Sequence, residues 1–131
     1  MIVLDTHALI WWVGGIKRLS KQAGQLVEEE KKRGEVMISV ISVWEAAILI
    51  KKGKLKLTMN LTEWVESLEK SFYVKIMPID SWIAIESVNL PGEFHKDPAD
   101  RMIVATARQL GAKLVSKDKK ILNYKHVQAV W

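Results

Sequence analysis

The chain has 131 residues, no cysteine and a formal net charge of +5. This length matches one domain of roughly 100–200 residues, so we expect residues 1–131 to form a single domain that folds without disulfides. The lack of cysteine excludes thiol nucleophiles, thiolate zinc sites and iron–sulfur clusters. The basic balance is compatible with a polyanionic partner such as nucleic acid.

The apolar segments match neither a secretory signal nor a transmembrane helix. Residues 1–15 lack a basic region and contain Asp5. The apolar run 36–50 contains Glu45 and is shorter than the ~20 residues that a bilayer-spanning helix needs. We therefore expect a cytoplasmic protein.

The hydrophobic periodicity predicts strands and helices that alternate along the chain. The predicted strands span residues 1–4, 36–39, 74–79, 112–116 and 127–131. The predicted helices span residues 7–13, 20–34, 42–53, 62–72, 81–90, 95–111 and 117–123. Gly34 ends the second helix, and Thr62 is the expected N-cap of the fourth. This alternation predicts βαβ crossovers and a mostly parallel sheet with helices on both faces.

Acidic residues follow the predicted strands, where α/β folds bind their ligands. They are Asp5, Glu45, Asp100 and Asp118. Because the carboxyl ends of parallel strands meet at one edge of the sheet, we expect these four carboxylates to face the same region.

Helix capping is an alternative role for each acid, because loops that enter helices often end in Asp, Ser or Thr. Glu45 follows Ser42 by three residues, which is the spacing of a capping box. Either Asp5 or Thr6 can cap the first helix. Asp118 lies among lysines, as in a solvated turn.

The segment "HKDPADRMIVATARQLG" (95–111) contains two aspartates with different expected roles. Pro98 suits the first helical position, which makes Asp97 the N-cap and Asp100 the third helical residue. The residues three, four and seven positions after Asp100 are apolar, so Asp100 lies at the edge of the buried face. An unpaired carboxylate is costly there.

Convergence of Asp5, Glu45 and Asp100 would raise their pKa values unless a cation binds between them. Mg²⁺ is the natural candidate because it takes oxygen ligands and binds phosphate oxygens at the same time. Carboxylates without cysteine or paired histidines favour Mg²⁺ or Mn²⁺ over zinc. The three histidines show no metal-binding spacing, so we expect none of them to be a ligand. His7 lies two residues after Asp5, within reach of a pocket, but a structural role is the expected one.

Three segments of the chain resemble the PIN-domain ribonucleases and, within them, the VapC toxins of type II toxin–antitoxin systems. These segments are "MIVLDTHALIWW", "ISVWEAAILIKKGKL" and "HKDPADRMIVATARQLGAKLVSKD". The resemblance covers essentially the whole chain. Its motifs, Asp-Thr after the first strand and Asp-Pro-x-Asp-Arg at the start of a late helix, are specific in combination.

The resemblance implies a three-layer α/β/α sandwich with an acidic pocket that holds Mg²⁺ or Mn²⁺. Asp5, Glu45 and Asp100 match the three core acids of the family, and Asp118 matches its more variable fourth acid. The implied activity is hydrolysis of RNA phosphodiester bonds by a metal-activated water. The number of metal ions stays open.

Further residues match the family with less defined roles. Ser116 matches a pocket-lining Ser or Thr, and Thr6 and Arg101 also match pocket positions. Asp97 keeps its structural role, with contact to the metal through water left open.

The expected partners follow from the charge balance and from the resemblance. Lys117, Lys119 and Lys120 flank Asp118 and are candidates for RNA binding. The basic run 51–56 is the expected end of a helix, where cations favour the helix dipole. By resemblance, the protein partners are a homodimer mate and a VapB-type antitoxin.

The six tryptophans divide into two expected groups. Trp44, Trp64 and Trp82 lie on helices with apolar neighbours, so we expect them in the core. Trp11 and Trp12 are adjacent and cannot both face one core, so one of them is expected at a partner surface.

Two alternative functions remain open, and the sequence argues against a third. A PIN-like module without catalysis would bind RNA or a partner, and a housekeeping PIN nuclease would act without an antitoxin. A signalling receiver domain would need adjacent acids after the first strand, but Thr6 follows Asp5.

Overall fold

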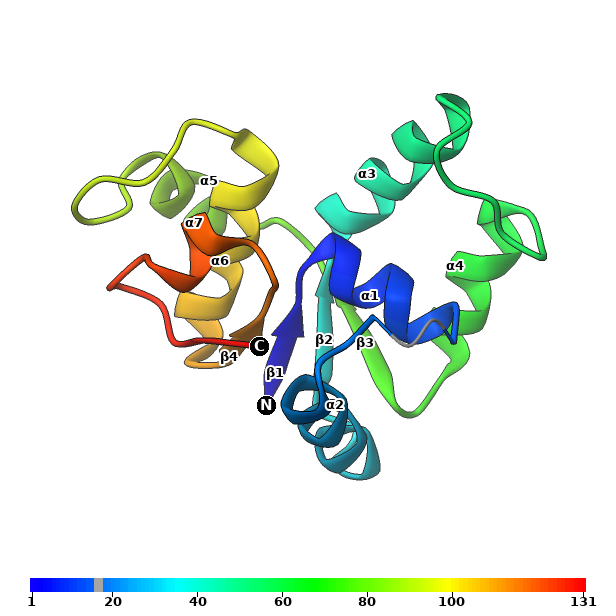
Figure 1. Cartoon of the computed structure of the whole chain (residues 1–131). Helices are drawn as coiled ribbons and strands as arrows, with labels where there is room; N and C mark the ends of the chain where they lie inside the picture. The colour runs from blue at the N-terminus through cyan, green and yellow to red at the C-terminus, as the bar shows by residue number, and fades with distance from the viewer. Residues whose placement is uncertain (16–17) are drawn as a thin grey trace.

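The computed structural model describes residues 1–15 and 18–131, and its core is one parallel sheet with helices on both faces (Figure 1). The strands are β1 (Ile2–Leu4), β2 (Val36–Ser39), β3 (Val74–Met77), β4 (Lys113–Val115) and β5 (Ala129–Val130). The helices are α1 (Thr6–Val13), α2 (Lys21–Arg33), α3 (Val40–Lys51), α4 (Leu61–Lys70), α5 (Ser81–Val88), α6 (Pro98–Leu110) and α7 (Lys119–Leu122). The predicted α/β class with a parallel central sheet is confirmed.

The strand order is β3-β2-β1-β4-β5, so β1 lies at the centre of the sheet. Val3 pairs with Met37 of β2 on one side and with Leu114 of β4 on the other. The chain moves outward from β1 in both directions, which makes the carboxyl end of β1 the topological switch point. Ligands of open α/β sheets bind at this point.

The two faces of the sheet are covered by different helices, each with its own hydrophobic cluster. Ile2 and Leu4 pack on the cluster formed with α1, α2 and α4, whereas Val3 packs on the cluster formed with α5, α6 and α7. All three side chains have no exposed surface. A strand buried on both faces explains why the first four residues are uniformly apolar.

The observed helix ends agree with those predicted from the sequence at several positions and differ from them at two. Gly34 ends α2 with a φ of 68°, and a Cβ there would lie 3.0 Å from the carbonyl oxygen of Phe72. The expected N-cap Thr62 is wrong, because Asn60 caps α4 by accepting from the amide of Glu63 at 2.9 Å. Helix α3 also begins earlier than expected, with Ser39 as its N-cap.

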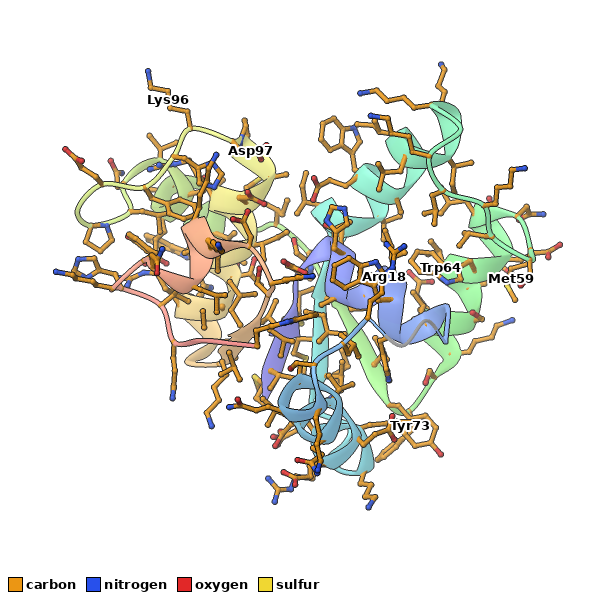
Figure 2. All side chains as sticks on the ribbon, in the orientation of Figure 1. Arg18, Met59, Trp64, Tyr73, Lys96 and Asp97 are labelled. Carbon is orange, nitrogen blue, oxygen red and sulfur yellow. The ribbon has the colours of Figure 1, made fainter. Side chains whose placement is uncertain are left out.

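The expectation that three tryptophans are core residues is confirmed for one and wrong for two. Trp64 is 3% exposed and packs between α4 and the sheet (Figure 2). Trp44 and Trp82 are 58% and 72% exposed. Helix α3 buries the small Ser42 and Ala46, and α5 buries Ile83, so the adjoining tryptophans point outward.

Among the described residues, no helix is long and apolar enough to cross a membrane.

Candidate active site

A cavity of about 570 Å³ lies at the switch point of the sheet. Its lining comes from segments that follow β1, β2 and β4 and from the start of α6. The lining residues are Asp5, Thr6, His7, Trp11, Glu45, Asp97, Asp100, Lys117 and Asp118. The four acids predicted from the sequence therefore face one cavity.

Asp5 is held rigidly at the carboxyl end of β1 and is only 7% exposed. Its Oδ1 caps α1 by accepting from the amide of Ala8 at 2.8 Å, and its Oδ2 accepts from the hydroxyl of Ser116. Its backbone amide donates to Val115 of β4 at 3.1 Å. Burial raises the pKa of Asp5, and the two hydrogen bonds offset part of that effect. Asp5 is thus both a helix cap and a cavity carboxylate.

Glu45 does not form the capping box that its spacing from Ser42 allows. The N-cap of α3 is Ser39, which places Glu45 in the second turn of the helix. The hydroxyl of Thr6 donates to Glu45 Oε1 at 2.5 Å and lies 3.0 Å from the hydroxyl of Ser42. Burial raises the pKa of Glu45, with a further contribution from the charge of Asp97. Glu45 therefore faces the cavity with its position fixed by Thr6.

Asp100 shows the strongest electrostatic perturbation. Burial, followed by repulsion from Asp97, Asp118, Glu45 and Asp5, raises its pKa to about 7. Asp97 is the N-cap of α6, as predicted, and accepts from the amide of Asp100 at 3.0 Å. The helix N-terminus favours a negative charge at Asp100, but this effect does not outweigh burial and the neighbouring acids.

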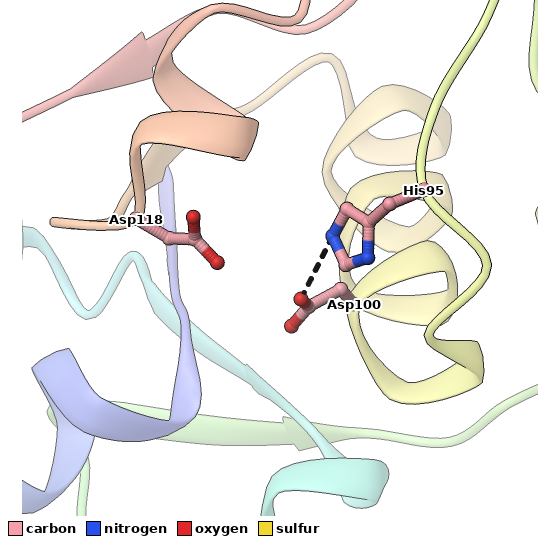
Figure 3. Close-up of side chains that lie close together, drawn as sticks. All are labelled: His95, Asp100 and Asp118. Carbon is pink, nitrogen blue, oxygen red and sulfur yellow. Dashed lines mark ion pairs between the residues drawn. The ribbon is translucent and has the colours of Figure 1, made fainter.

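Asp118 combines a capping role with a position in the cavity. It is the N-cap of α7 and accepts from the amide of Lys120 at 2.8 Å. Its own amide donates to the hydroxyl of Ser116 at 3.0 Å. Ligand atoms of Asp100, Asp118 and His95 all lie within 4.8 Å of one another (Figure 3).

Several residues that the sequence associates with the site lie outside the cavity lining. Ser116 is fully buried, and its hydroxyl donates to Asp5 without lining the cavity. Arg101 turns away from the acids, and its guanidinium donates to backbone carbonyls of α5 and of the segment that precedes α6. Of the three candidate lysines, only Lys117 lines the cavity; Lys119 and Lys120 are exposed on α7.

Trp11 and His95 lie at the site, where the sequence analysis does not place them, and His7 lines the cavity that its position after Asp5 allows it to reach. Trp11 lines the cavity, and the ammonium of Lys117 lies 5.8 Å from the centre of its ring. Trp12 packs against the core instead, so neither tryptophan has the exposed position expected for a partner surface. The short sequence separation of Trp11 and His7 from Asp5 is a signal for the first helix. No spacing pattern marks His95.

The donor set suits a divalent cation. Five carboxylates line the cavity, whereas Lys117 is its only Lys or Arg in the part of the chain that the structure describes. Burial and repulsion from the neighbouring acids raise the pKa of Asp100, as expected where carboxylates converge without a cation. Oxygen ligands in this number are what hard divalent cations require. The fold and this cavity define an α/β/α domain with a carboxylate site at its switch point.

Comparison with known proteins identifies the family. The PIN domain profile matches residues 2–127, so the chain belongs to the PIN-domain family. It is 33% identical over 129 residues to Ribonuclease VapC22 of Mycobacterium tuberculosis, an alignment that covers 98% of this chain and 95% of that protein.

Solved structures share the fold. A toxin–antitoxin complex from Klebsiella pneumoniae contains a chain with 22% identity and a TM-score of 0.67, covering 100% of this chain and 97% of that chain. VapBC2 from Rickettsia felis, bound to a promoter DNA fragment, contains one with 17% identity and a TM-score of 0.71, covering 99% and 98%.

Proposed function

We propose that this protein is a metal-dependent endoribonuclease, formed by residues 1–131 as one domain, that acts as the toxin of a VapBC-type toxin–antitoxin pair. The observation that carries the proposal is the group of carboxylates at the switch point, in which the pKa of Asp100 is raised to about 7. The 33% identity to Ribonuclease VapC22 supports RNA as the substrate.

In this proposal Asp5, Glu45 and Asp100 hold Mg²⁺ or Mn²⁺, with Asp118 as a fourth carboxylate. A bound ion of this kind lowers the pKa of a water molecule and stabilises negative charge on a phosphate. Asp5 is oriented by two hydrogen bonds and Glu45 by Thr6, so two of these carboxylates keep their positions without a ligand. Because water is the nucleophile in this reaction, no side chain has to act as one.

The RNA would be attracted by cations beside the acidic cavity. Lys117 lies at the cavity and offers its ammonium to a phosphate, while Lys119 and Lys120 extend the positive charge along α7. The ring of Trp11 beside Lys117 provides an apolar face at the same rim, of the kind on which RNA bases stack. We expect single-stranded RNA to be cleaved in preference to duplex RNA.

The proposed protein partners follow from the relatives. Structures of similar fold are described as toxin–antitoxin complexes, which supports a VapB-type antitoxin as the partner of this chain. A second copy of the toxin is part of the same proposal. An RNA-cleaving toxin of this kind acts in the cytoplasm.

The experiment that tests the proposal is cleavage of a mixed RNA pool by the purified protein with Mg²⁺, with Mn²⁺ and with EDTA. Asp5→Asn and Asp100→Asn remove carboxylate charge with little change in shape, and Asn at position 5 still caps α1. Asp97→Asn is the control because asparagine also caps helices well. Metal-dependent cleavage that is lost in the first two variants and retained in the third supports the proposal. Equal residual cleavage in all proteins would identify a contaminant and favour a binding module without catalysis.

A further inference from the structure

The imidazole of His95 lies beside Asp100 and Asp118, on a segment that precedes α6 and outside the lining of the acidic cavity (Figure 3). Its Nε2 lies 3.0 Å from Oδ2 of Asp100. This nitrogen has no solvent-exposed surface and makes no aligned hydrogen bond within the described residues. A buried polar atom without a hydrogen bond is rare, which indicates that it has a role in a bound state of the site.

The contact of the second ring nitrogen favours one tautomer. Nδ1 of His95 accepts a hydrogen bond from the backbone amide of Asp97 at 3.4 Å. A nitrogen that accepts carries no hydrogen, so in the neutral ring the hydrogen is on Nε2. Nε2 is therefore a donor toward Asp100, and in this tautomer it has no lone pair for a metal.

The segment that carries His95 is fixed by its neighbours. The guanidinium of Arg101 donates to the carbonyls of His95 and Phe94 at 3.2 and 2.9 Å, and to those of Ser87 and Val88 at 2.6 and 3.2 Å. The ring of Phe94 lies against the rings of His95 and Tyr124, with centroid distances of 4.4 and 4.8 Å. These contacts hold the imidazole in place before any ligand binds.

We propose that His95 is a positioning residue, whose imidazole donates from Nε2 to Oδ2 of Asp100 and orients this carboxylate for a divalent cation. The two atoms are already at hydrogen-bond distance, so the proposed bond requires only a change in their relative orientation. This inference rests on the proposed function and deepens it. Arg101 then acts on the site indirectly, through the segment that carries His95.

The test is the affinity of the protein for Mn²⁺, measured by calorimetry and by electron paramagnetic resonance. His95→Ala removes the donor, whereas His95→Gln keeps an amide N–H about as far from the backbone as Nε2. We expect His95→Ala to weaken Mn²⁺ binding by roughly 10–100-fold, the usual effect of losing a hydrogen bond to a metal ligand. We expect His95→Gln to restore most of the affinity.

The controls separate this role from a general effect on the fold. His126→Ala removes an exposed histidine outside the acidic cavity, and we expect it to bind Mn²⁺ like the wild type. Thermal unfolding of each metal-free variant shows whether it is folded. Nitrogen NMR of the metal-free wild type reports the tautomer of His95 directly, and we expect the hydrogen on Nε2.

Three results would overturn the proposal. One is an unchanged Mn²⁺ affinity in a folded His95→Ala variant. Another is a His95→Gln variant that binds no better than His95→Ala. The third is a nitrogen coupling to bound Mn²⁺ that His95→Ala removes, because it would make His95 a direct ligand. A wild type that neither binds Mn²⁺ nor cleaves RNA would instead overturn the proposed function itself.

Discussion

Carboxylates lie near both ends of β1, but only at the amino end do positively charged groups of the chain compensate their charge. At the amino end, Glu30 is 6% exposed and lies 2.6 Å from the amino group of Met1 and 3.2 Å from Arg33. At the carboxyl end, Asp5 and Asp100 share a cavity with three further acids and, among the residues that the structure describes, a single lysine. A strand of only three residues separates these two environments.

The pKa shifts at the two ends have opposite directions. The amino group of Met1 lowers the pKa of Glu35, which favours its charged form. Burial and neighbouring acids raise the pKa of Asp100 to about 7, which disfavours its charged form. The acids at the amino end therefore have their counterions within the chain, whereas the proposed function supplies those at the carboxyl end with a metal ion.

The largest expected effect is on RNA cleavage, which should depend on the acids at the carboxyl end of β1 and not on those at the amino end. Asp5→Asn should reduce metal-dependent RNA cleavage about 1,000-fold, at the upper end of what the loss of one stabilising group costs an active site. Glu30→Gln should cleave at the wild-type rate. Single-turnover cleavage at saturating metal measures both. Loss of cleavage in Glu30→Gln, in a folded protein, would contradict the division between the two ends.

The second prediction concerns pH and the metal-free protein. The pKa of Asp100 is higher in the folded chain than its ordinary value of 3.8, so the folded state binds more protons than the unfolded state between about pH 4 and 7. Stability should therefore fall as the pH rises through this range, by at most about 4 kcal/mol for this group. Urea unfolding in EDTA at several pH values measures the effect.

The Asp100→Asn variant and the addition of metal are two further tests of the same prediction. The variant should lose the part of the pH dependence that Asp100 contributes, while Asp5 and Glu45 keep theirs, and it should be more stable than the wild type at pH 8 without metal. At a metal concentration 100 times the Kd, the wild type should gain about 2.7 kcal/mol, and the variant should gain less. The idea fails if the metal-free wild type is equally stable at pH 5 and pH 8.

A smaller effect is expected at the residue that orients Glu45. Thr6→Val removes the hydroxyl that donates to Glu45 while keeping the shape of the side chain. Cleavage at limiting metal should fall about 10-fold, as when other partners of metal ligands are removed. Thr6→Ser keeps the hydroxyl and should retain activity. Equal cleavage by Thr6→Val and wild type would show that Glu45 needs no partner.

The smallest effect is expected at the paired end. Glu30→Gln weakens the ion pairs with Met1 and Arg33, whose side chains are 35% and 68% exposed. Because solvent screens these partners, the loss in the free energy of unfolding should be about 1 kcal/mol. Urea unfolding at pH 7 measures it, with the exposed Glu63→Gln as a control. A stabilised Glu30→Gln variant would mean that the pairing at this end is not effective.

Local sequence patterns account for most of the elements. The apolar run at 1–4, the glycine at 34 and the Asp-Pro pair at 97–98 fixed a buried strand, the end of α2 and the start of α6, because these effects act within a few residues. The same reasoning missed the exposure of Trp44 and Trp82. Apolar character alone does not tell which face of a helix packs on the sheet.

The candidate site was predictable in part. Asp5, Glu45, Asp100 and Asp118 were expected at one edge because parallel strands place their carboxyl ends together, and all four line one cavity. His95 had no such signal. Its position depends on Arg101 binding four carbonyls of a folded-back segment, which is a tertiary arrangement.

The sequence by itself determined the alternation of elements, the family likeness and the identity of the acids, because periodicity and motifs are local properties. Only the tertiary structure decided which polar groups contact each acid and which charges stay uncompensated. The pKa of Asp100 depends on Asp118, Glu45 and Asp5, whose distances from it are set when β1 takes the central place in the sheet. Electrostatic energy depends on distance and burial, and both are fixed only by the folded chain.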